Sequence, residues 1–272
     1  MKFTKMHGCG NDFILIEDLN ENINDLNDVA KKLCDRHFGI GADGILVVRN
    51  TDEADIEMII INADGSYAAM CGNGIRCFAK YVLEKGIVKG NRINIKTGDG
   101  IKKVLIDSED EVVKKITINM GKPNFKPQSI PSKSCEEIVN KEVVINNKNY
   151  KITSLLMGVP HTAIFGKLDE FNINEGKYIE KYELFEDGTN VNFIEVLNKD
   201  EIKVKTWERG AGATLACGTG CCASVAAGNR LGLLNKKVRV YIPGGELIIE
   251  LKDGDIFMTG SAESVFKGEC EI

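Results

Sequence analysis

Met70-Cys71-Gly72-Asn73-Gly74 and Ala216-Cys217-Gly218-Thr219-Gly220 are two segments of this 272-residue chain with nearly the same pattern. Each places a cysteine directly before a Gly-polar-Gly turn, and an apolar run with helical spacing follows each turn. The two cysteines are 146 residues apart (217 minus 71), and the same shift places Gly86 on Gly232. The sequence therefore predicts one structural unit used twice, with a thiol at the same position in each copy.

Short, turn-bounded and often alternating apolar runs predict that strands dominate the chain. They cover residues 2–16, 45–48, 56–61, 93–96, 112–119, 193–197, 202–206, 238–242 and 247–251. Helical patterns cover residues 26–38 before Gly39, 75–83 before Gly86, and the wholly apolar run 221–227. Most neighbouring strands lack a helix between them, which favours antiparallel pairing. We expect an α+β fold of two pseudo-symmetric domains, each a mainly antiparallel sheet or barrel wrapped around a central helix.

The chain is long enough for two medium-sized domains. Pro123, Pro127 and Pro131 cluster in a polar stretch near its middle, where we expect a linker. The expected N-terminal domain covers residues 1–120 and is completed by 264–272, and the expected C-terminal domain covers 121–263.

The composition is ordinary for a globular protein, with 43% hydrophobic and 28% charged residues. A net charge of −5 and a pI near 5.5 give no reason to expect nucleic acid or an anionic membrane as a partner. The apolar runs are too short to span a bilayer, and the N-terminal residues lack the apolar stretch of a secretory signal. We therefore expect a cytoplasmic location.

The nine cysteines are odd in number and irregularly spaced, so we expect free thiols in a reducing compartment. The sequence has no pair of C-x-x-C elements, which argues against a structural zinc site. A cysteine at a helix N-terminus is special, because free N–H groups and the helix dipole stabilise a thiolate and can also hold a carboxylate. Two such turns facing each other would suit proton transfer at the α-carbon of an amino acid. One thiolate would remove a proton, and the opposite thiol would return one.

Other interpretations of the two turns stay open from the residues alone. The cysteines could be small buried hydrophobes copied by duplication, or they could form a redox disulfide if their Cα atoms lie within about 7 Å. A phosphate-binding loop is weaker, because neither turn has the Walker spacing. Residues 39–44, Gly-Ile-Gly-Ala-Asp-Gly, match G-x-G-x-x-G, but the expected helix precedes them and the expected strand follows. This order is the reverse of a dinucleotide-binding site, which we therefore reject.

The residues around both turns resemble those of diaminopimelate epimerases, a family of cofactor-independent amino-acid epimerases. The matching stretches run from residues 6–13 to residues 241–245, so nearly the whole chain is covered. The most specific are residues 62–66 with 70–77, and residues 208–212 with 216–220. The resemblance implies an isomerase that converts LL- to meso-2,6-diaminopimelate, in lysine and peptidoglycan precursor biosynthesis. It also implies an active site in the cleft between two domains.

The resemblance implies roles for individual residues. Cys71 and Cys217 would be the acid–base pair, and His161 and Glu208 would support the reacting amino group or tune the site. The residues implied to bind substrate are Asn11, Asn62, Gly72, Asn73, Asn190, Glu208, Arg209, Gly218 and Thr219. Among them, the turn residues would hold the reacting carboxylate through backbone N–H groups, and Arg209 would clamp the distal carboxylate. No cofactor and no metal is implied. The expected partners are a small amino-acid substrate and a second copy of the chain in a homodimer.

Three positions depart from the common pattern of the family. Val159 replaces an asparagine that normally reaches the distal end of the substrate. Losing one such hydrogen bond costs about 1–3 kcal/mol when nothing replaces it. Ala213 stands where glutamate is common, and Gly44 where some members have glutamine. Because Val159 bears on substrate recognition, the alternative function is a related cofactor-independent racemase of another amino acid, such as histidine or lanthionine.

Overall fold

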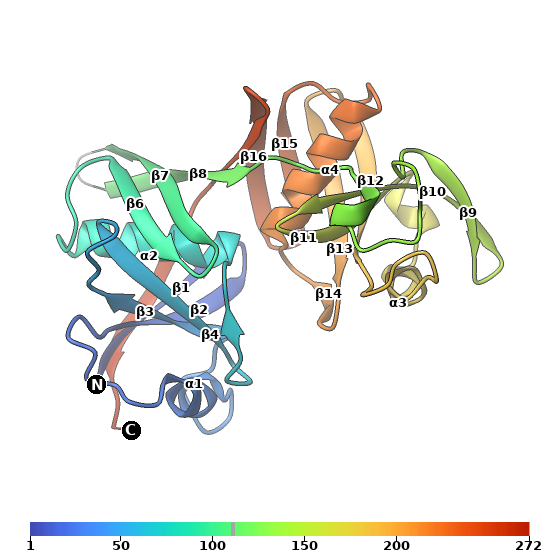
Figure 1. The fold of residues 1–272 in the computed structure, drawn as a ribbon. Coiled ribbons are helices and arrows are strands. Elements are labelled where there is room, and N and C mark those ends of the chain that lie inside the picture. Colours follow the sequence, from blue (N-terminus) through green and yellow to red (C-terminus); the bar gives the residue numbers. More distant parts are fainter. Residues whose placement is uncertain (110–111, 272) are drawn as a thin grey trace. The chain divides into compact units, whose positions relative to one another are not determined.

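The computed structural model describes residues 1–109 and 112–271, which divide into two compact units (Figure 1). Unit 1 comprises residues 1–118 and 259–272, and unit 2 comprises residues 119–258. Strands β8 (Val112–Gly121) and β17 (Asp255–Gly260) carry the chain from one unit into the other. In the described part of the chain, every helix is too short or too polar to cross a membrane.

Unit 1 is built mainly from strands, with two α-helices. Its strands are β1 (Lys2–Gly8), β2 (Asn11–Glu17), β3 (Gly44–Arg49), β4 (Ile56–Asn62), β5 (Tyr67–Ala68), β6 (Arg92–Thr97), β7 (Gly100–Glu109) and β18 (Glu263–Glu269). Its helices are α1 (Leu26–Cys34) and α2 (Gly72–Glu84). The C-terminal strand β18 pairs antiparallel with β1, so the two ends of the chain belong to the same sheet.

Unit 2 has the same character. Its strands are β9 (Lys141–Ile145), β10 (Lys148–Met157), β11 (Val159–Phe165), β12 (Asn190–Asn198), β13 (Glu201–Glu208), β14 (Gly212–Thr214), β15 (Lys237–Ile242) and β16 (Gly245–Lys252). Its helices are α3 (Gly176–Glu180) and α4 (Gly218–Arg230), with short 3-10 turns η1 (Pro127–Ser129), η2 (Leu168–Glu170) and η3 (Ile173–Glu175). The predicted α+β class, dominated by strands and with few helices, is confirmed.

The sheets are mainly antiparallel, but each unit also contains parallel pairs that the sequence did not reveal. In unit 1, β2 pairs parallel with β3 and β4 with β6. In unit 2, β11 pairs parallel with β12 and β13 with β15. A helix lies in the chain between the partners of each parallel pair, in the order α1, α2, α3 and α4. Parallel neighbours need such crossovers, and the two units repeat the same order of hairpins and crossovers.

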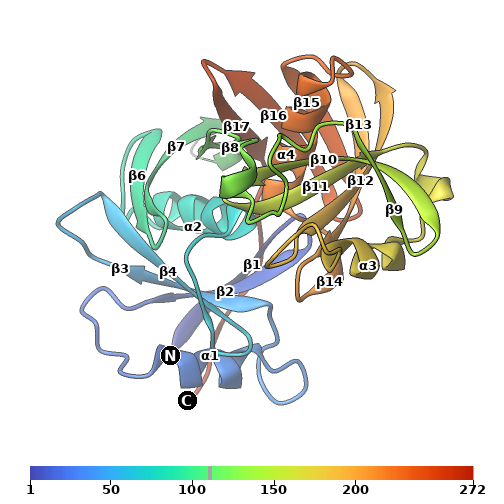
Figure 2. The ribbon, with the colours of Figure 1, turned by 45° about the vertical axis from the view of Figure 1, so that its right-hand side comes forward.

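The helices α2 and α4 occupy equivalent places in the two units. Adding 146 to the limits of α2, Gly72 and Glu84, gives the limits of α4, Gly218 and Arg230. Residues 72–82 of α2 and nearly all of 218–228 of α4 are buried, as expected for central helices. Figures 1 and 2 show α2 against β1 and β6 of unit 1 and α4 among the strands of unit 2. Gly86 and Gly232 follow the helices with φ of +69° and +72°, values that glycine adopts without strain.

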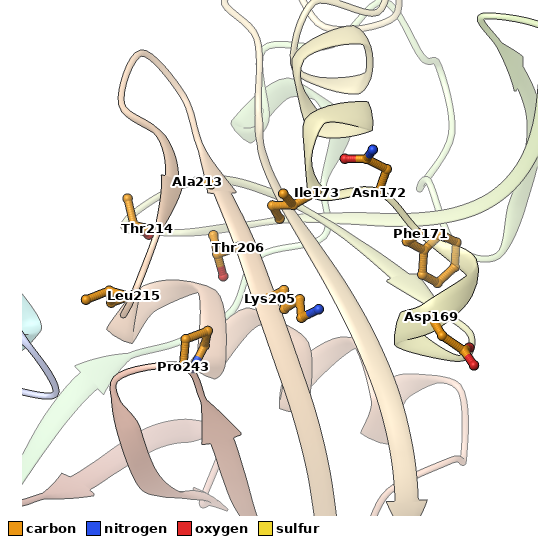
Figure 3. Close-up of a pocket in the computed structure, with 10 residues that line it drawn as sticks. All are labelled: Asp169, Phe171, Asn172, Ile173, Lys205, Thr206, Ala213, Thr214, Leu215 and Pro243. Atoms are coloured by element: carbon orange, nitrogen blue, oxygen red, sulfur yellow. The ribbon is translucent and has the colours of Figure 1, made fainter.

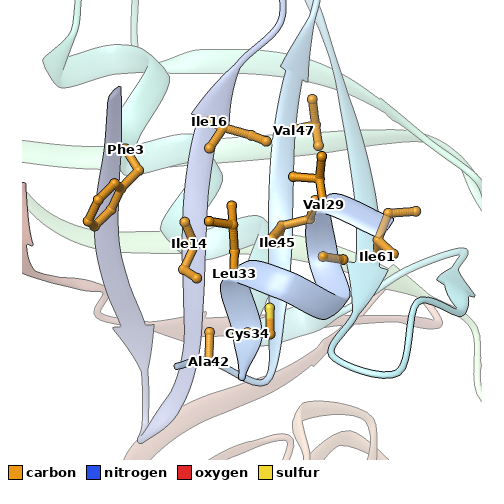
Figure 4. Packing of buried hydrophobic residues seen from close by; sticks show 11 residues of the cluster. Phe3, Ile14, Ile16, Val29, Leu33, Cys34, Ala42, Ile45, Val47 and Ile61 are labelled. Atoms are coloured by element: carbon orange, nitrogen blue, oxygen red, sulfur yellow. The ribbon is translucent and has the colours of Figure 1, made fainter. Parts of the chain in front are cut away.

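Helix α1 lies in the crossover between β2 and β3. It covers the side of the unit 1 strands that faces away from α2 (Figure 1). Val29, Leu33 and Cys34 share one side of the helix and pack on Ile14 and Ile45 (Figure 4). The helix ends at Cys34, four residues before the predicted end at residue 38. The carboxylate of Asp35 accepts the backbone N–H groups of His37 and Phe38, and such local bonds compete with helix continuation.

Two further expectations from sequence need correction. The predicted strand over residues 2–16 is a hairpin, because Cys9 and Gly10 have φ of +55° and +82° and reverse the chain. The proline segment expected as a linker lies inside unit 2, where Pro127 and Ile130 are buried. The chain passes from one unit to the other along β8 and β17, and neither strand contains a proline.

Candidate active site

In unit 1, Cys71 is the N-cap of α2. Its backbone is extended, with φ −142° and ψ 118°, and its Sγ accepts the backbone N–H of Gly74 at 3.4 Å. The first turn of a helix leaves N–H groups without partners in the helix and carries partial positive charge. The sulfur therefore lies at the end of the helix that favours negative charge.

A fixed amide faces the Cys71 sulfur. The Sγ of Cys71 donates to Oδ1 of Asn11 at 3.5 Å, and Nδ2 of Asn73 donates to the same oxygen at 3.2 Å. The Nδ2 of Asn11 donates in turn to Oδ2 of Asp43 at 2.7 Å. Since a carboxylate only accepts, Asp43 fixes which way the Asn11 amide points. The structure thus brings three of the predicted residues of unit 1 together.

The carboxylate that orients Asn11 belongs to a charged cluster. Arg36 bonds both Asp12 and Asp43, and Lys5 lies 2.6 Å from Asp12 and donates to the Gly41 carbonyl. Burial acts to raise the pKa of Asp12, but the bonds to Arg36 and Lys5 outweigh it and lower that pKa to about 2. Residues 39–44, rejected above as a nucleotide-binding loop, join α1 to β3 and supply Asp43 to this cluster.

Arg76 contacts the turn that follows Cys71, whereas the Asn62 side chain bonds elsewhere. Arg76 is fully buried, and its guanidinium donates to the Gly72 carbonyl at 3.0 Å and to Oδ1 of Asn73 at 2.9 Å. Asn62 ends β4, and its Nδ2 donates to the Ser66 hydroxyl at 3.0 Å. This side-chain bond of Asn62 therefore lies within its own turn and does not join the group formed by Asn11, Cys71 and Asn73.

In unit 2, Cys217 is the N-cap of α4, with φ −125° and ψ 103°. Its Sγ lies 3.5 Å from the Thr219 hydroxyl, and the residue is 6% exposed. Burial and the negative charge of Glu208 raise the pKa of the Cys217 thiol well above its usual range. The Thr219 hydroxyl and the Gly220 N–H act in the opposite direction but do not compensate. In this state the second cysteine of the repeat is therefore a thiol.

Three predicted residues lie near the C-terminal end of β13 and the start of β12. The Oδ1 of Asn190 accepts the backbone N–H of Arg209 at 2.9 Å, and its Nδ2 donates to the Pro160 carbonyl at 2.8 Å. The guanidinium of Arg209 donates to the Asp187 carbonyl at 2.8 Å, and Glu208 accepts the Thr214 hydroxyl at 2.6 Å. The bonds that Asn190 makes thus fix the backbone of Arg209.

His161 is fully buried in β11 beside these residues. Its Nδ1 lies 3.2 Å from Nδ2 of Asn192, whose Oδ1 accepts the Thr206 hydroxyl at 3.0 Å. Its Nε2 has no hydrogen-bond partner among the described residues. Burial, with a smaller contribution from the positive charge of Arg209, lowers the pKa of His161 to about 3. The ring is therefore neutral at physiological pH.

A pocket of about 600 Å³ opens beside this group but does not include the cysteine (Figure 3). Its lining is Asp169, Phe171, Asn172, Ile173, Lys205, Thr206, Ala213, Thr214, Leu215 and Pro243. Thr206 and Thr214 form part of its wall, and their hydroxyl groups bond Asn192 and Glu208. Ala213, which departs from the family pattern, lines this pocket, whereas Val159 is 38% exposed at the start of β11.

Comparison with known proteins shows the family to which the chain belongs. The family model for diaminopimelate epimerase matches residues 3–126 and 153–265. A diaminopimelate epimerase from Clostridium perfringens is 58% identical over 98% of this chain and 98% of its own length. Another from Caldanaerobacter subterraneus is 48% identical, with both chains covered completely.

The chain belongs to the diaminopimelate epimerase family. Solved structures show the same fold outside the diaminopimelate epimerase family. A probable proline racemase from Agrobacterium radiobacter has a TM-score of 0.73 at 15% identity, covering 100% of this chain and 93% of its own. A PhzF-family phenazine biosynthesis protein from Bacillus anthracis has a TM-score of 0.71 at 14% identity, covering 100% and 99%. These two likenesses concern the fold alone.

Sequence reasoning missed the residues that hold the predicted ones in place, chiefly Asp43 and Asn192. Asn192 is two residues after Asn190, and this spacing puts both side chains on one face of a strand, which was an available signal. Asp43 lies in the discarded glycine-rich segment, and only the tertiary structure brings it to Asn11. Asp43 orients Asn11, and Asn192 contacts His161, but neither Asp43 nor Asn192 belongs to a recognisable motif.

Burial of His161 predicts a pH-dependent stability. Its pKa is lowered in the folded protein, so the unfolded chain binds the extra proton as pH falls below the ordinary histidine value. Stability present above about pH 6.5 should then be lost on acidification, by about 1.4 kcal/mol per pH unit near pH 5. Denaturant unfolding at several pH values measures it. His161→Gln should show a shallower dependence over this window, and an identical slope in the variant would contradict the prediction.

Proposed function

We propose that this chain is a diaminopimelate epimerase, an isomerase that interconverts LL- and meso-2,6-diaminopimelate in lysine and peptidoglycan precursor biosynthesis. The observation that carries the proposal is the cysteine at the N-cap of both central helices, Cys71 on α2 and Cys217 on α4. Inverting an α-carbon requires a proton to leave one face and another to arrive at the opposite face. Two thiols of equivalent placement supply one group for each face.

Cys217 is the proton donor of the resting pair in this proposal. Its raised pKa favours the thiol, and the Thr219 hydroxyl beside the sulfur can bond either state. When Cys217 gives its proton to the α-carbon, the sulfur becomes a thiolate at the N-terminus of α4, where the helix dipole favours it. The Gly220 N–H acts in the same direction.

Cys71 is then the base, and its contact with Asn11 offers a way to prepare it. In the structure the Cys71 thiol donates to Oδ1 of Asn11, and the amide is held in that direction by Asp43. A substrate ammonium group is a stronger donor and would take over this oxygen. The sulfur would keep the Gly74 N–H, a donor that stabilises the thiolate. Binding of substrate would thus favour loss of the Cys71 proton to solvent and formation of the thiolate, which can then accept the α-proton.

The helix N-termini are proposed to hold the reacting carboxylate. The backbone N–H groups of Gly72 and Asn73 on α2, and of Gly218 and Thr219 on α4, lie in first turns, the part of a helix that favours an anion. As the α-proton leaves, negative charge develops on the carboxylate, and preorganised donors stabilise it. The carbanion therefore forms without a cofactor or a metal in this mechanism.

The remaining predicted residues are proposed to recognise the rest of the substrate. Asn62, Asn190 and Arg209 would bind amino and carboxylate groups, with the planar guanidinium of Arg209 on the distal carboxylate. Glu208 and His161 would tune the site, since the charge of Glu208 already acts on Cys217. Residues 1–120 with 264–272 and residues 121–263 would form two epimerase domains, and the protein would be a cytoplasmic homodimer.

Deuterium uptake tests the proposal. Purified, reduced protein in heavy water should exchange the α-proton of LL-diaminopimelate for deuterium as the meso isomer forms, followed by NMR and chiral chromatography. Absence of both exchange and isomerisation would refute an epimerase. Val159 motivates a parallel panel of amino acids that lack the distal carboxylate. Faster racemisation of one of these than of diaminopimelate would refute the proposed substrate and leave the two-thiol chemistry standing.

A further inference from the structure

We infer that Asn192 is a positioning residue that fixes the proton of the neutral His161 ring on Nε2, so that His161 serves as a hydrogen-bond donor to a ligand oxygen. The tautomer follows from contacts within unit 2. Its use in catalysis rests on the proposed function. Asn192 belongs to none of the motifs that carry the family resemblance.

The side chain of Asn192 is held from two sides. It is fully buried in β12, and its Oδ1 accepts the Thr206 hydroxyl at 3.0 Å. The same oxygen lies against Gly220 of α4, where a Cβ would be 2.4 Å away. With the oxygen facing Thr206 and the glycine, the amide nitrogen faces Nδ1 of His161 at 3.2 Å.

This direction of the amide decides where the imidazole proton lies. An amide nitrogen only donates, so Nδ1 of His161 must present its lone pair to Nδ2 of Asn192. A neutral imidazole carries one proton, which must then be on Nε2. Burial holds the ring neutral, because its pKa is lowered to about 3.

The resulting N–H group has no partner among the described residues, although His161 is fully buried. A buried donor without an acceptor costs free energy, and such a group is retained where a ligand completes the bond. The positive charge of Arg209 acts on the same ring. A donor and a cation so placed fit an anionic oxygen, such as a carboxylate of the substrate. The same tautomer excludes Nε2 as a proton acceptor.

NMR of protein labelled with ¹⁵N-histidine tests the tautomer directly. The chain has three histidines, so His161→Gln assigns the signals of His161. In the wild-type protein we expect a protonated Nε2 and an unprotonated Nδ1, unchanged between about pH 5.5 and 8. A proton found on Nδ1, or a ring that titrates in this range, would overturn the inference.

The variant Asn192→Asp replaces the donor by a group that only accepts. We expect the proton to move to Nδ1, or the ring to become charged, and kcat/KM to fall by about 10–100-fold, as for other residues that orient catalytic groups. Unchanged histidine signals in a folded Asn192→Asp protein would overturn the inference. The matched control is Asn149→Asp, because Asn149 is exposed on β10 and is not part of the pocket lining. It should leave His161 unchanged.

A second variant covers the case in which a buried carboxylate prevents folding. Asn192→Ala leaves Nδ1 without its donor, so we expect a mixture of the two tautomers in place of one. A single Nε2-protonated form in this variant would show that Asn192 does not decide the tautomer. The NMR measurements of the tautomer need no turnover, so they separate the inference from the proposed function. Failed epimerisation with the expected tautomers would refute the function only, and intact epimerisation with the other tautomer would refute the inference only.

Discussion

Replacement of either N-cap cysteine by serine is expected to reduce epimerisation by about 10²–10⁴-fold, the range for losing one general acid or base. Serine is nearly isosteric and a good N-cap, so Cys71→Ser should keep the Gly74 N–H satisfied and α2 folded. Its hydroxyl, however, is a far weaker acid than a thiol and does not form the required anion near neutral pH. Initial rates with LL-diaminopimelate measure the effect.

The two variants should differ in whether they still exchange the α-proton of the LL isomer. If Cys71 removes the α-proton of the LL isomer, Cys71→Ser loses both exchange and inversion from that isomer, whereas Cys217→Ser retains slow exchange with deuterium without inversion. Cys135→Ser is the matched control, since Cys135 is exposed and lies outside the site, and it should behave as wild type. Turnover within threefold of wild type in either N-cap variant would refute the two-thiol mechanism.

The duplicated helices were predictable because their signal lies in local sequence. A cysteine, two glycines and an apolar run determine where α2 and α4 begin, and Gly86 and Gly232 determine where they end. The same local signals failed for α1, where the amphipathic spacing continues to residue 38 but the Asp35 side chain ends the helix. The spacing of apolar residues shows which face of a helix is buried. It does not show whether a side-chain hydrogen bond, such as that of Asp35, ends the helix earlier.

The candidate site divides in the same way between local and non-local information. The family motifs name the groups expected to touch substrate. The residues that hold them come from other parts of the chain: Asp43 is 32 residues from Asn11, and Asn192 is 31 from His161. Such partners are set by strand register, through β2 beside β3 and β11 beside β12. Both of these pairs are parallel crossovers, the feature that the sequence did not reveal.

Gly220→Ala should affect activity far more than Gly74→Ala, although the two glycines are equivalent in the repeat. A Cβ at Gly220 would lie 2.4 Å from Oδ1 of Asn192, and one at Gly74 would lie 3.2 Å from the end of the Leu46 side chain. Leu46 can adjust by a few tenths of an ångström, but Asn192 is held by Thr206 and His161.

Displacement of Asn192 would move His161. The Cβ added at residue 220 would also press on Cys217, whose Sγ would lie 3.3 Å from it. We expect Gly220→Ala to lower kcat/KM by more than about 10²-fold, with about 1–3 kcal/mol of overpacking strain, and Gly74→Ala to lower it by less than about tenfold. In a double-mutant cycle, Asn192→Gly removes the obstructing oxygen, so Gly220→Ala should cost much less stability in that background. An equal cost in both backgrounds would show that the clash with Asn192 is not the cause.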